Sequence, residues 1–318
     1  MSEFSSQRIQ VGISACLLGQ EVRYDGGHKQ SRFCRYELTE YFDFQPICPE
    51  LAIGMGTPRK TIRLVEDDQR IRLQASDGSI DVTESMEAFS EQQTKRLSHL
   101  SGYVVCAKSP SCGMERVSVY SPAKNNASRD GVGLFTAKLM ANNPLLPVEE
   151  DGRLNDAILR ENFISRVYAY HDWQCMQQSG LTVSKIMLFH SRYKYLLMAH
   201  NPERYRQLGP VVANLSENDQ AGFERYIVEF MAIMKHNISR KNHCNVLQHL
   251  QGYFKKQLSS EQRQELADHI INYKKGMLPL LAPVVLLQHY LREHPNDYLS
   301  AQVYLNPHPM ALRLRYSL

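Results

Sequence analysis

The chain has 318 residues, of which 43% are hydrophobic and 22% charged, and its net charge is +4. This length favours two domains, and this composition excludes a disordered chain, a collagen-like fibre and a disulfide-rich miniprotein. The longest apolar run, residues 277–287, is 11 residues long and contains two prolines. A membrane-spanning helix needs about 20 apolar residues. We expect a cytoplasmic protein without a membrane partner, because the N-terminal residues also lack the pattern of a secretory signal.

The first half of the chain alternates short apolar runs with helical patterns. Apolar runs at residues 8–15, 42–47 and 102–105 predict strands, and the periodicity of residues 82–100 predicts a helix. Strands separated by helices form βαβ units. We therefore predict an α/β domain over residues 1–169, with a Rossmann-like, mainly parallel sheet.

The second half has few glycines and long helical patterns. These patterns predict helices over residues 183–200, 223–238, 242–258, 260–273 and 281–293. Residues 149–152 resemble a loop and residues 154–178 a helix, which places the domain boundary near residue 169. We predict a second, all-α domain over residues 170–318.

The charge is distributed unevenly between the two halves. Residues 1–170 carry 20 Lys+Arg and 22 Asp+Glu, whereas residues 171–318 carry 17 and 11, with 10 of the 12 His. A basic half favours a polyanionic partner, although a solvated helical surface gives the same excess. Aromatic and basic residues alternate at 253–256 and 273–275, which suits RNA, while aromatics at helical spacing are also typical of a core. The candidate RNA-binding residues are Lys255, Lys256, Lys274 and Lys275.

The seven cysteines contain no CxxC pair, which gives no support to a zinc ribbon or a thioredoxin-like site. Cys16, Cys48 and Cys112 each follow a predicted strand. Because parallel strands end at one edge of a sheet, three thiolates from these loops can converge there and leave one metal position open. The alternative interpretation is that each is a small buried residue.

The segments around these cysteines carry more specific motifs. They are VGISACLLG at 11–19, VRYDGGHK at 22–29, CPE at 48–50 with GMGTPR at 54–59, and KSPSCG at 108–113. Over residues 8–165 the chain resembles the thiouracil desulfidase family. The second half, in residues 241–256 and 298–305, resembles the helical domain often fused behind it, a fusion similar to bacterial desulfidases that act on thiolated uridine in tRNA.

This resemblance implies a [4Fe-4S] cluster held by Cys16, Cys48 and Cys112, with one iron open to the sulfur of a C=S group. It also implies that Glu50 transfers protons and that Ser109 and, less directly, Ser111 orient the substrate or water. The basic residues in the same motifs are candidates for substrate binding: Arg23, His28, Lys29, Arg59 and Lys108.

Each of these residues also has a structural interpretation. Glu50 is favourable in the first turn of a helix, Ser109 forms turns, and any single basic residue can be a solvated charge. Cys34 and Cys106 are available as a fourth ligand, but the family pattern does not require them, and we interpret both as buried or incidental. The remaining two cysteines, Cys175 and Cys244, are expected to be packing residues.

The leading hypothesis is an iron–sulfur desulfidase that converts 4-thiouridine or 2-thiouridine in tRNA to uridine and hydrosulfide. The second keeps the cluster and assigns free thiouracil or another thiolated base as substrate. The third is a non-catalytic RNA-binding stress protein whose cysteines hold zinc or nothing.

Overall fold

The computed structural model describes residues 8–67, 70–121 and 127–315, and the chain divides between Asn155 and Asp156 into two compact units. Helix α4 (Ala157–Gln178) begins at this division, where the Asp156 carboxylate accepts the backbone N–H groups of Ile158 and Leu159. Such a cap fixes the start of a helix. The boundary expected near residue 169 falls inside α4, so the structure divides the chain earlier than the sequence pattern indicated.

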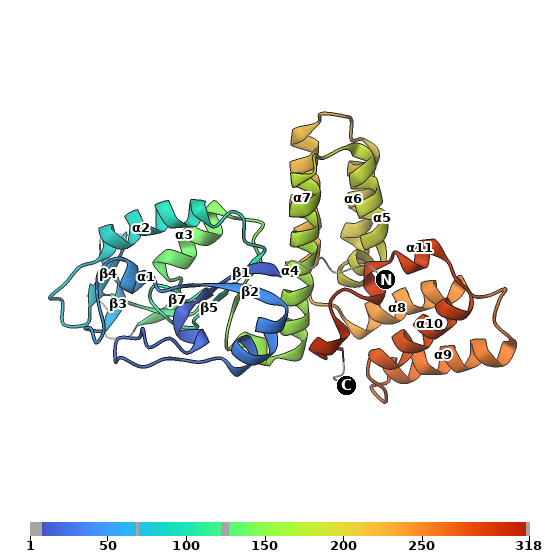
Figure 1. Ribbon diagram of the computed structural model, residues 1–318, viewed down its shortest axis with the longest axis horizontal. Helices are drawn as coiled ribbons and strands as arrows, with labels where there is room; N and C mark the ends of the chain where they lie inside the picture. Colours follow the sequence, from blue (N-terminus) through green and yellow to red (C-terminus); the bar gives the residue numbers. More distant parts are fainter. Residues whose placement is uncertain (1–7, 68–69, 122–126, 316–318) are drawn as a thin grey trace. The chain divides into compact units, whose positions relative to one another are not determined.

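The first unit is built on a parallel sheet (Figure 1), with the strand order β2-β1-β5-β8. Its strands are β1 (Ile9–Ser14), β2 (Phe42–Ile47), β5 (Gly102–Val105) and β8 (Val148–Glu150). All three pairings are parallel. Strand β5 is buried along its whole length, as expected for a strand covered on both faces. The predicted α/β class with a Rossmann-like, mainly parallel sheet is confirmed.

Helices α2 (Thr83–Arg96) and α3 (Leu134–Asn142) lie side by side in the first unit (Figure 1). The Asn142 side chain donates to the Thr94 hydroxyl over 2.8 Å, which links the two helices. Phe135 of α3 packs on Tyr103 of β5, with ring centroids 6.0 Å apart. The helix predicted from the periodicity of residues 82–100 is therefore confirmed and belongs to the layer over the sheet.

A second, mixed sheet was not predicted. Its order is β4-β3-β6-β7, with β3 (Ile62–Asp67), β4 (Arg70–Ala75), β6 (Val117–Tyr120) and β7 (Ser128–Gly131). In β3 only Leu64 is fully buried, and charged residues stand at three of its six positions. So little apolar alternation gives a weak strand signal.

Strand β8 corrects a second expectation, because residues 149–150 were assigned to a loop. Two adjacent carboxylates normally disfavour a buried strand. Here the Glu150 carboxylate accepts the backbone N–H groups of Met114 and Glu115, and Arg153 donates to Glu149 over 2.6 Å. These partners compensate the burial of both charges.

The second unit is entirely helical, which confirms the predicted all-α class. After α4 its helices are α5 (Val183–His200), α6 (Pro202–Ala213), α7 (Gln220–Met234), α8 (Arg240–Gly252), α9 (Ser260–Lys274), α10 (Leu281–Glu293) and α11 (Asp297–Ser300). Helix α6, which contains Pro210, was not predicted, and α7 and α8 end earlier than expected. Among the described residues, no helix is both long and apolar enough to span a membrane.

Candidate active site

A cavity of about 590 Å³ opens at the carboxyl edge of the parallel sheet. It is lined by segments that follow β1, β2 and β5, three neighbouring strands of that sheet. Ligands of open α/β sheets bind at this edge, where neighbouring loops diverge from the strand ends. We call it the sheet-edge cavity.

Three of the lining cysteines are those that the sequence singled out. Cys16 lies in the turn after β1, Cys48 directly follows β2, and Cys112 lies in the loop after β5. Burial raises the pKa of the Cys112 thiol, and the charge of Glu50 adds to the effect. Burial and Glu50 likewise raise the pKa of Cys48 to about 11. Without a bound cation these thiols stay protonated at neutral pH, so the pocket favours a positively charged group that can replace their protons.

Glu50 is held against one of these cysteines. It lies in the first turn of the short helix α1 (Pro49–Ala52) and is 9% exposed. The Cys48 thiol donates to its Oε2 atom over 3.3 Å, and Nη2 of Arg59 lies 3.9 Å from the same oxygen. Arg59 also donates to the Val22 carbonyl over 2.9 Å, which fixes the guanidinium. The carboxylate therefore lines the cavity at the level of the cysteine sulfurs, where it can hold or release a proton.

The two candidate serines have different surroundings. Ser109 lines the cavity, and its Oγ accepts the backbone N–H groups of Ser111 over 3.3 Å and Cys112 over 3.1 Å. This side chain therefore shapes the turn that carries Cys112. Ser111 is fully buried and does not line the cavity, and its Oγ has no hydrogen-bond partner among the described residues.

The Cys112 loop is packed tightly against the start of α3. A Cβ atom at Gly133 would lie 2.5 Å from the Ser111 carbonyl and 2.7 Å from the Cys112 nitrogen. The Thr136 hydroxyl donates to the Cys112 carbonyl over 2.7 Å and holds the loop from the same side. We expect Gly133→Ala to displace this loop and to lower the free energy of unfolding by about 1–3 kcal/mol.

Chemical denaturation measures that cost, with Gly152→Ala as control because a Cβ there meets no atom within 4 Å. The same variants show whether the displacement reaches the cysteine: iron uptake should fall in Gly133→Ala and not in Gly152→Ala. Equal stability of the two variants would contradict the proposed packing constraint.

The five basic candidates all line the sheet-edge cavity. They are Arg23, His28, Lys29, Arg59 and Lys108. Arg59 is tied to Glu50 and to backbone carbonyls, and Lys29 to Asp151, whose carboxylate lies 3.2 Å from its Nζ. Their roles toward a substrate remain predictions.

Cys106 belongs to the same cavity, although the sequence interpretation set it aside. It directly follows β5, as Cys48 directly follows β2, and that position was the available signal. The Cys16 thiol donates a hydrogen bond to the Cys106 sulfur, which raises the pKa of Cys16 and lowers that of Cys106.

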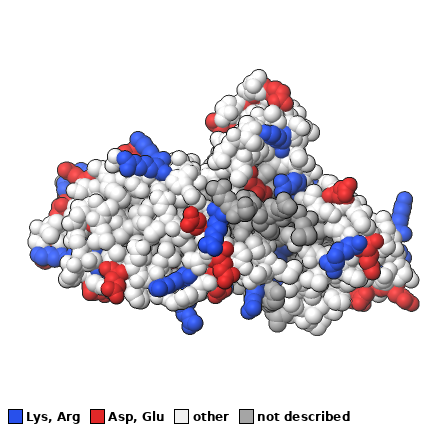
Figure 2. All heavy atoms as spheres, in the orientation of Figure 1, with Lys and Arg blue, Asp and Glu red and all other residues white. Residues whose placement is uncertain are grey.

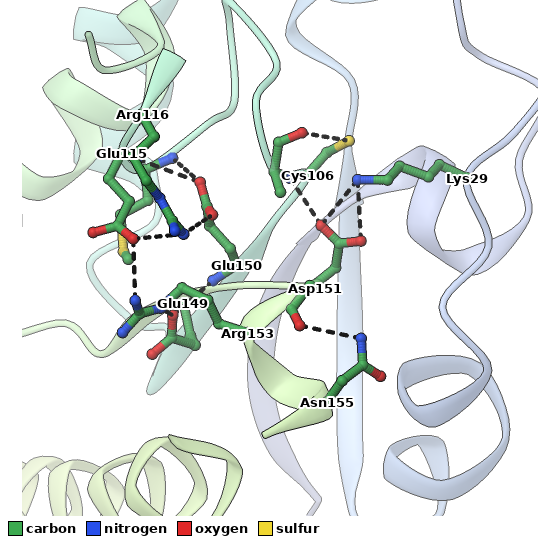
Figure 3. A network of polar contacts seen from close by, with 12 residues as sticks. Lys29, Cys106, Glu115, Arg116, Glu149, Glu150, Asp151, Arg153 and Asn155 are labelled. Atoms are coloured by element: carbon green, nitrogen blue, oxygen red, sulfur yellow. Dashed lines mark hydrogen bonds and ion pairs between the residues drawn. The ribbon is translucent and has the colours of Figure 1, made fainter. Parts of the chain in front are cut away.

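Two further residues organise this corner and were also missed. Asp151, which follows β8, pairs with Lys29 (Figure 3) and accepts the Ala107 backbone N–H over 2.8 Å. Although burial opposes it, the charges of Cys106 and Asp151 raise the pKa of Lys29. Ser14, at the end of β1, accepts the Cys106 backbone N–H over 3.0 Å and bonds the Cys112 sulfur. The ends of all four parallel strands thus contribute to one polar site.

The donors around the cavity are of the type that iron–sulfur clusters use. Three cysteines from separate loops line it, and thiolates are soft ligands with affinity for iron. Within residues 8–67, 70–121 and 127–315, no three His, Cys, Asp or Glu side chains are arranged to hold one metal ion.

Each half of the chain matches a known protein family. The 2-thiouracil desulfurase family matches residues 11–151, and a family of unknown function, DUF1722, matches residues 194–309. The uncharacterized protein YbgA of Escherichia coli (strain K12) is 35% identical over 159 residues, which are 49% of this chain and 94% of YbgA. A solved structure of the [4Fe-4S]-dependent thiouracil desulfidase TudS is 28% identical, covers 46% of this chain and 94% of that chain, and gives a TM-score of 0.39. The chain therefore combines an N-terminal domain of the 2-thiouracil desulfurase family with a C-terminal DUF1722 domain, and it is a relative of YbgA.

Proposed function

We propose that the protein is a desulfidase that removes sulfur from thiolated uridine in tRNA and uses a [4Fe-4S] cluster held by Cys16, Cys48 and Cys112. One observation carries the proposal: three cysteines from three strand ends line one cavity together with a buried glutamate, in a domain of the 2-thiouracil desulfurase family. Three cysteine ligands leave a fourth iron without a protein ligand.

The overall reaction exchanges sulfur for oxygen without a change of oxidation state. Water adds at the ring carbon, the C=S bond is replaced by C=O, and sulfide leaves with a proton as hydrosulfide. The cluster would supply a Lewis-acidic iron with affinity for sulfur. The protein must remove a proton from water and return one to the departing sulfur.

Glu50 is the group that we assign to this proton transfer. Its Oε2 atom already accepts a hydrogen bond from the Cys48 thiol, and Nη2 of Arg59 lies 3.9 Å from the same oxygen. As a cluster ligand Cys48 would be a thiolate without this hydrogen, and the Glu50 oxygen would then be open to water or substrate. Arg59 then keeps the carboxylate directed into the cavity.

The remaining basic side chains suit the anionic parts of a nucleotide. Arg23, His28 and Lys108 line the cavity beside the cysteine loops. A volume of about 590 Å³ exceeds that of a single base, and pockets of about 300–1,000 Å³ are typical of sites for whole small ligands. The cluster would share this volume with the substrate, and the basic side chains suit the phosphate of a nucleotide extruded from an RNA.

The helical unit offers an aromatic surface for the rest of the RNA. Tyr253 is 40% exposed and stacks on Tyr298, with ring centroids 5.8 Å apart, and its hydroxyl lies 3.2 Å from that of Tyr195. Lys194 places its Nζ 5.1 Å from the Tyr195 ring centroid and 6.0 Å from that of Tyr298. We call these four residues the tyrosine platform. Tyr253 is the exposed ring of this group, Tyr298 is partly exposed, and Tyr195 is buried. An exposed aromatic ring beside a cation suits stacking by an unpaired base.

The four lysines that the sequence singled out for RNA binding are exposed, but their aromatic neighbours are not. Lys255, Lys256, Lys274 and Lys275 are exposed, whereas their neighbours Phe254 and Tyr273 are buried in the core. On the part of the surface described in Figure 2, Lys and Arg side chains lie scattered among Asp and Glu instead of forming one continuous patch. The platform is therefore a better-supported RNA contact than the lysines alone.

The double variant Tyr253→Ala/Tyr298→Ala tests the tRNA assignment. Each base stack lost costs about 1–3 kcal/mol, so we expect turnover of thiolated tRNA at sub-saturating concentration to fall at least tenfold. Turnover of free 4-thiouracil should not change. Tyr36→Ala is the control, because Tyr36 is 58% exposed and does not line the sheet-edge cavity. Unchanged turnover of tRNA in the double variant would overturn this RNA contact, and turnover of the free base alone would make thiouracil the substrate.

A further inference from the structure

The outer face of the second sheet carries an aromatic ring beside a cation that the proposed chemistry does not use. The buried side chains Leu64 of β3 and Val119 of β6 are register partners, so they share the inner face of that sheet. Because side chains alternate along a strand, Arg63 and Tyr120 share the opposite face. Tyr120 is 40% exposed, and the guanidinium carbon of Arg63 lies 4.8 Å from the centroid of its ring. We call these two residues the Arg63–Tyr120 pair.

The charge of Arg63 is not balanced as the charges of the arginines on neighbouring β4 are. Arg70 pairs with Glu87 over 2.8 Å. Arg72 pairs with Asp67 over 2.7 Å. Within the part of the chain that the structure describes, no carboxylate pairs with Arg63, and its guanidinium contacts the tyrosine ring instead. This cation therefore remains available to an anion.

The same strand leads to the sheet-edge cavity. Lys60, Thr61 and Ile62, at the start of β3, line that cavity. Thr61 lies on the side of the strand that Arg63 shares, and the two residues between which the chain advances are about 7 Å apart along a strand. All of these residues belong to the first unit. A nucleotide in the cavity is joined to its neighbours in the RNA, so the RNA chain must cross the rim of the cavity, and β3 lies on one path across it.

The chemistry of the pair matches the two parts of a nucleotide. An exposed aromatic ring stacks on a base whatever its identity, and an arginine binds phosphate. The register partner of Arg63 on β4 is Gln74, a half-buried polar side chain. A polar surface around a single exposed ring suits a nucleotide better than the broad apolar patch that a protein partner requires.

We propose that the Arg63–Tyr120 pair binds a nucleotide that neighbours the thiolated one in a single-stranded segment of the substrate RNA. The Tyr120 ring stacks on its base, and the Arg63 guanidinium contacts its phosphate. This inference rests on the proposed RNA substrate and adds a recognition site that free thiouracil cannot use. It complements the tyrosine platform, which belongs to the helical unit.

Binding of a short, fluorescent, single-stranded oligouridylate to the anaerobically reconstituted full chain tests the proposal, by fluorescence anisotropy over a series of salt concentrations. Tyr120→Leu keeps an apolar side chain on the sheet and removes the ring, whereas Tyr120→Phe keeps the ring. Arg63→Gln removes the positive charge. Tyr36→Leu and Arg35→Gln are the matched controls, because the Arg35 guanidinium carbon lies 5.6 Å from the ring centroid of the exposed Tyr36 and neither residue lines the cavity.

We expect Tyr120→Leu to weaken oligouridylate binding about fivefold or more, as the loss of one base stack requires, without a change in salt dependence. Tyr120→Phe should bind as tightly as the unmodified chain. Arg63→Gln should reduce the slope of log affinity against log salt concentration by about 0.7, because one phosphate contact to a single strand is lost. A purely structural role of Arg63 would not change that slope, and neither control should change the affinity or the slope.

Unchanged affinity in Tyr120→Leu, an unchanged salt slope in Arg63→Gln, or no binding of the oligouridylate would overturn the inference. The proposed desulfidase function is tested separately by hydrosulfide release from thiolated tRNA. A chain that binds the oligouridylate through this pair and releases no hydrosulfide would contradict the proposed function and support the RNA site.

Discussion

Replacing any one of Cys16, Cys48 and Cys112 with alanine is expected to abolish the iron–sulfur cluster. The three residues come from three different strand ends, so each substitution removes the one proposed ligand of its loop. Cys106 lines the same cavity and is tested separately below. After anaerobic reconstitution the unmodified chain should contain about four iron and four sulfide per chain. Each variant should fall below a quarter of that content, with complete loss of desulfidation.

Cys34→Ala is the matched control for this experiment. Cys34 is a fully buried cysteine of the same unit that does not line the sheet-edge cavity. Cys106→Ala is expected to retain the cluster too, and it tests whether the sulfur that accepts a hydrogen bond from Cys16 is a spare thiol or a ligand. Full iron content in any of the three alanine variants would show that the ligand set is wrong.

Glu50→Gln is expected to keep the cluster and to lose turnover. Glutamine preserves the size of the side chain and its contact with Arg59 through the amide oxygen, but it cannot take up a proton at neutral pH. Removal of a general acid–base group typically costs about 10²–10⁴-fold in rate. We therefore expect kcat to fall within that range while the iron content and the binding of thiolated substrate remain.

Asp25→Asn provides the control for the loss of one negative charge, because Asp25 lines the same cavity and its side chain is about half exposed. Its effect on kcat should be less than tenfold. If Glu50→Gln loses iron instead of turnover, Glu50 is a positioning residue for Cys48 through the contact of 3.3 Å. If it keeps both, it has no part in catalysis.

The sequence predicted the fold class and the strands that lead to the candidate site, but it did not predict every element around that site. The apolar runs before Cys16 and Cys48 predicted two strands. In the structure these strands are parallel neighbours, so their carboxyl ends lie at one edge of the sheet. Strand β8 could not be predicted from its two glutamates, since the backbone N–H groups that Glu150 accepts belong to Met114 and Glu115 in a distant loop. Such compensation of charge depends on the tertiary structure.

Dependence on the tertiary structure also explains why the sequence missed Cys106 and why it placed Ser111 in the site. Cys112 lies inside the KSPSCG motif, whereas Cys106 lies two residues before its start. The structure nevertheless brings Cys106 into contact with Cys16. Ser111 stands beside Cys112 in that motif and nevertheless faces away from the cavity. A loop sequence identifies a motif, whereas the direction of each side chain depends on packing, here against Gly133.

The net charge of +4 is the sum of a nearly neutral first half and a basic second half. The excess of basic residues lies in the helical unit, where the tyrosine platform and the exposed lysines are found. The near-neutral half carries Glu50 and the three cysteines that are the proposed cluster ligands. This division accords with one unit for the chemistry and one for RNA.

The most direct test of the central claim is the quantity of hydrosulfide released from a thiolated uracil substrate by the anaerobically reconstituted protein. The exchange of sulfur for oxygen needs only water, so the account predicts one hydrosulfide for each uracil or uridine formed, without added reductant or oxidant. It also predicts that Cys48→Ala gives none. Release that requires a reductant, or product formed equally by the protein without iron, would contradict it.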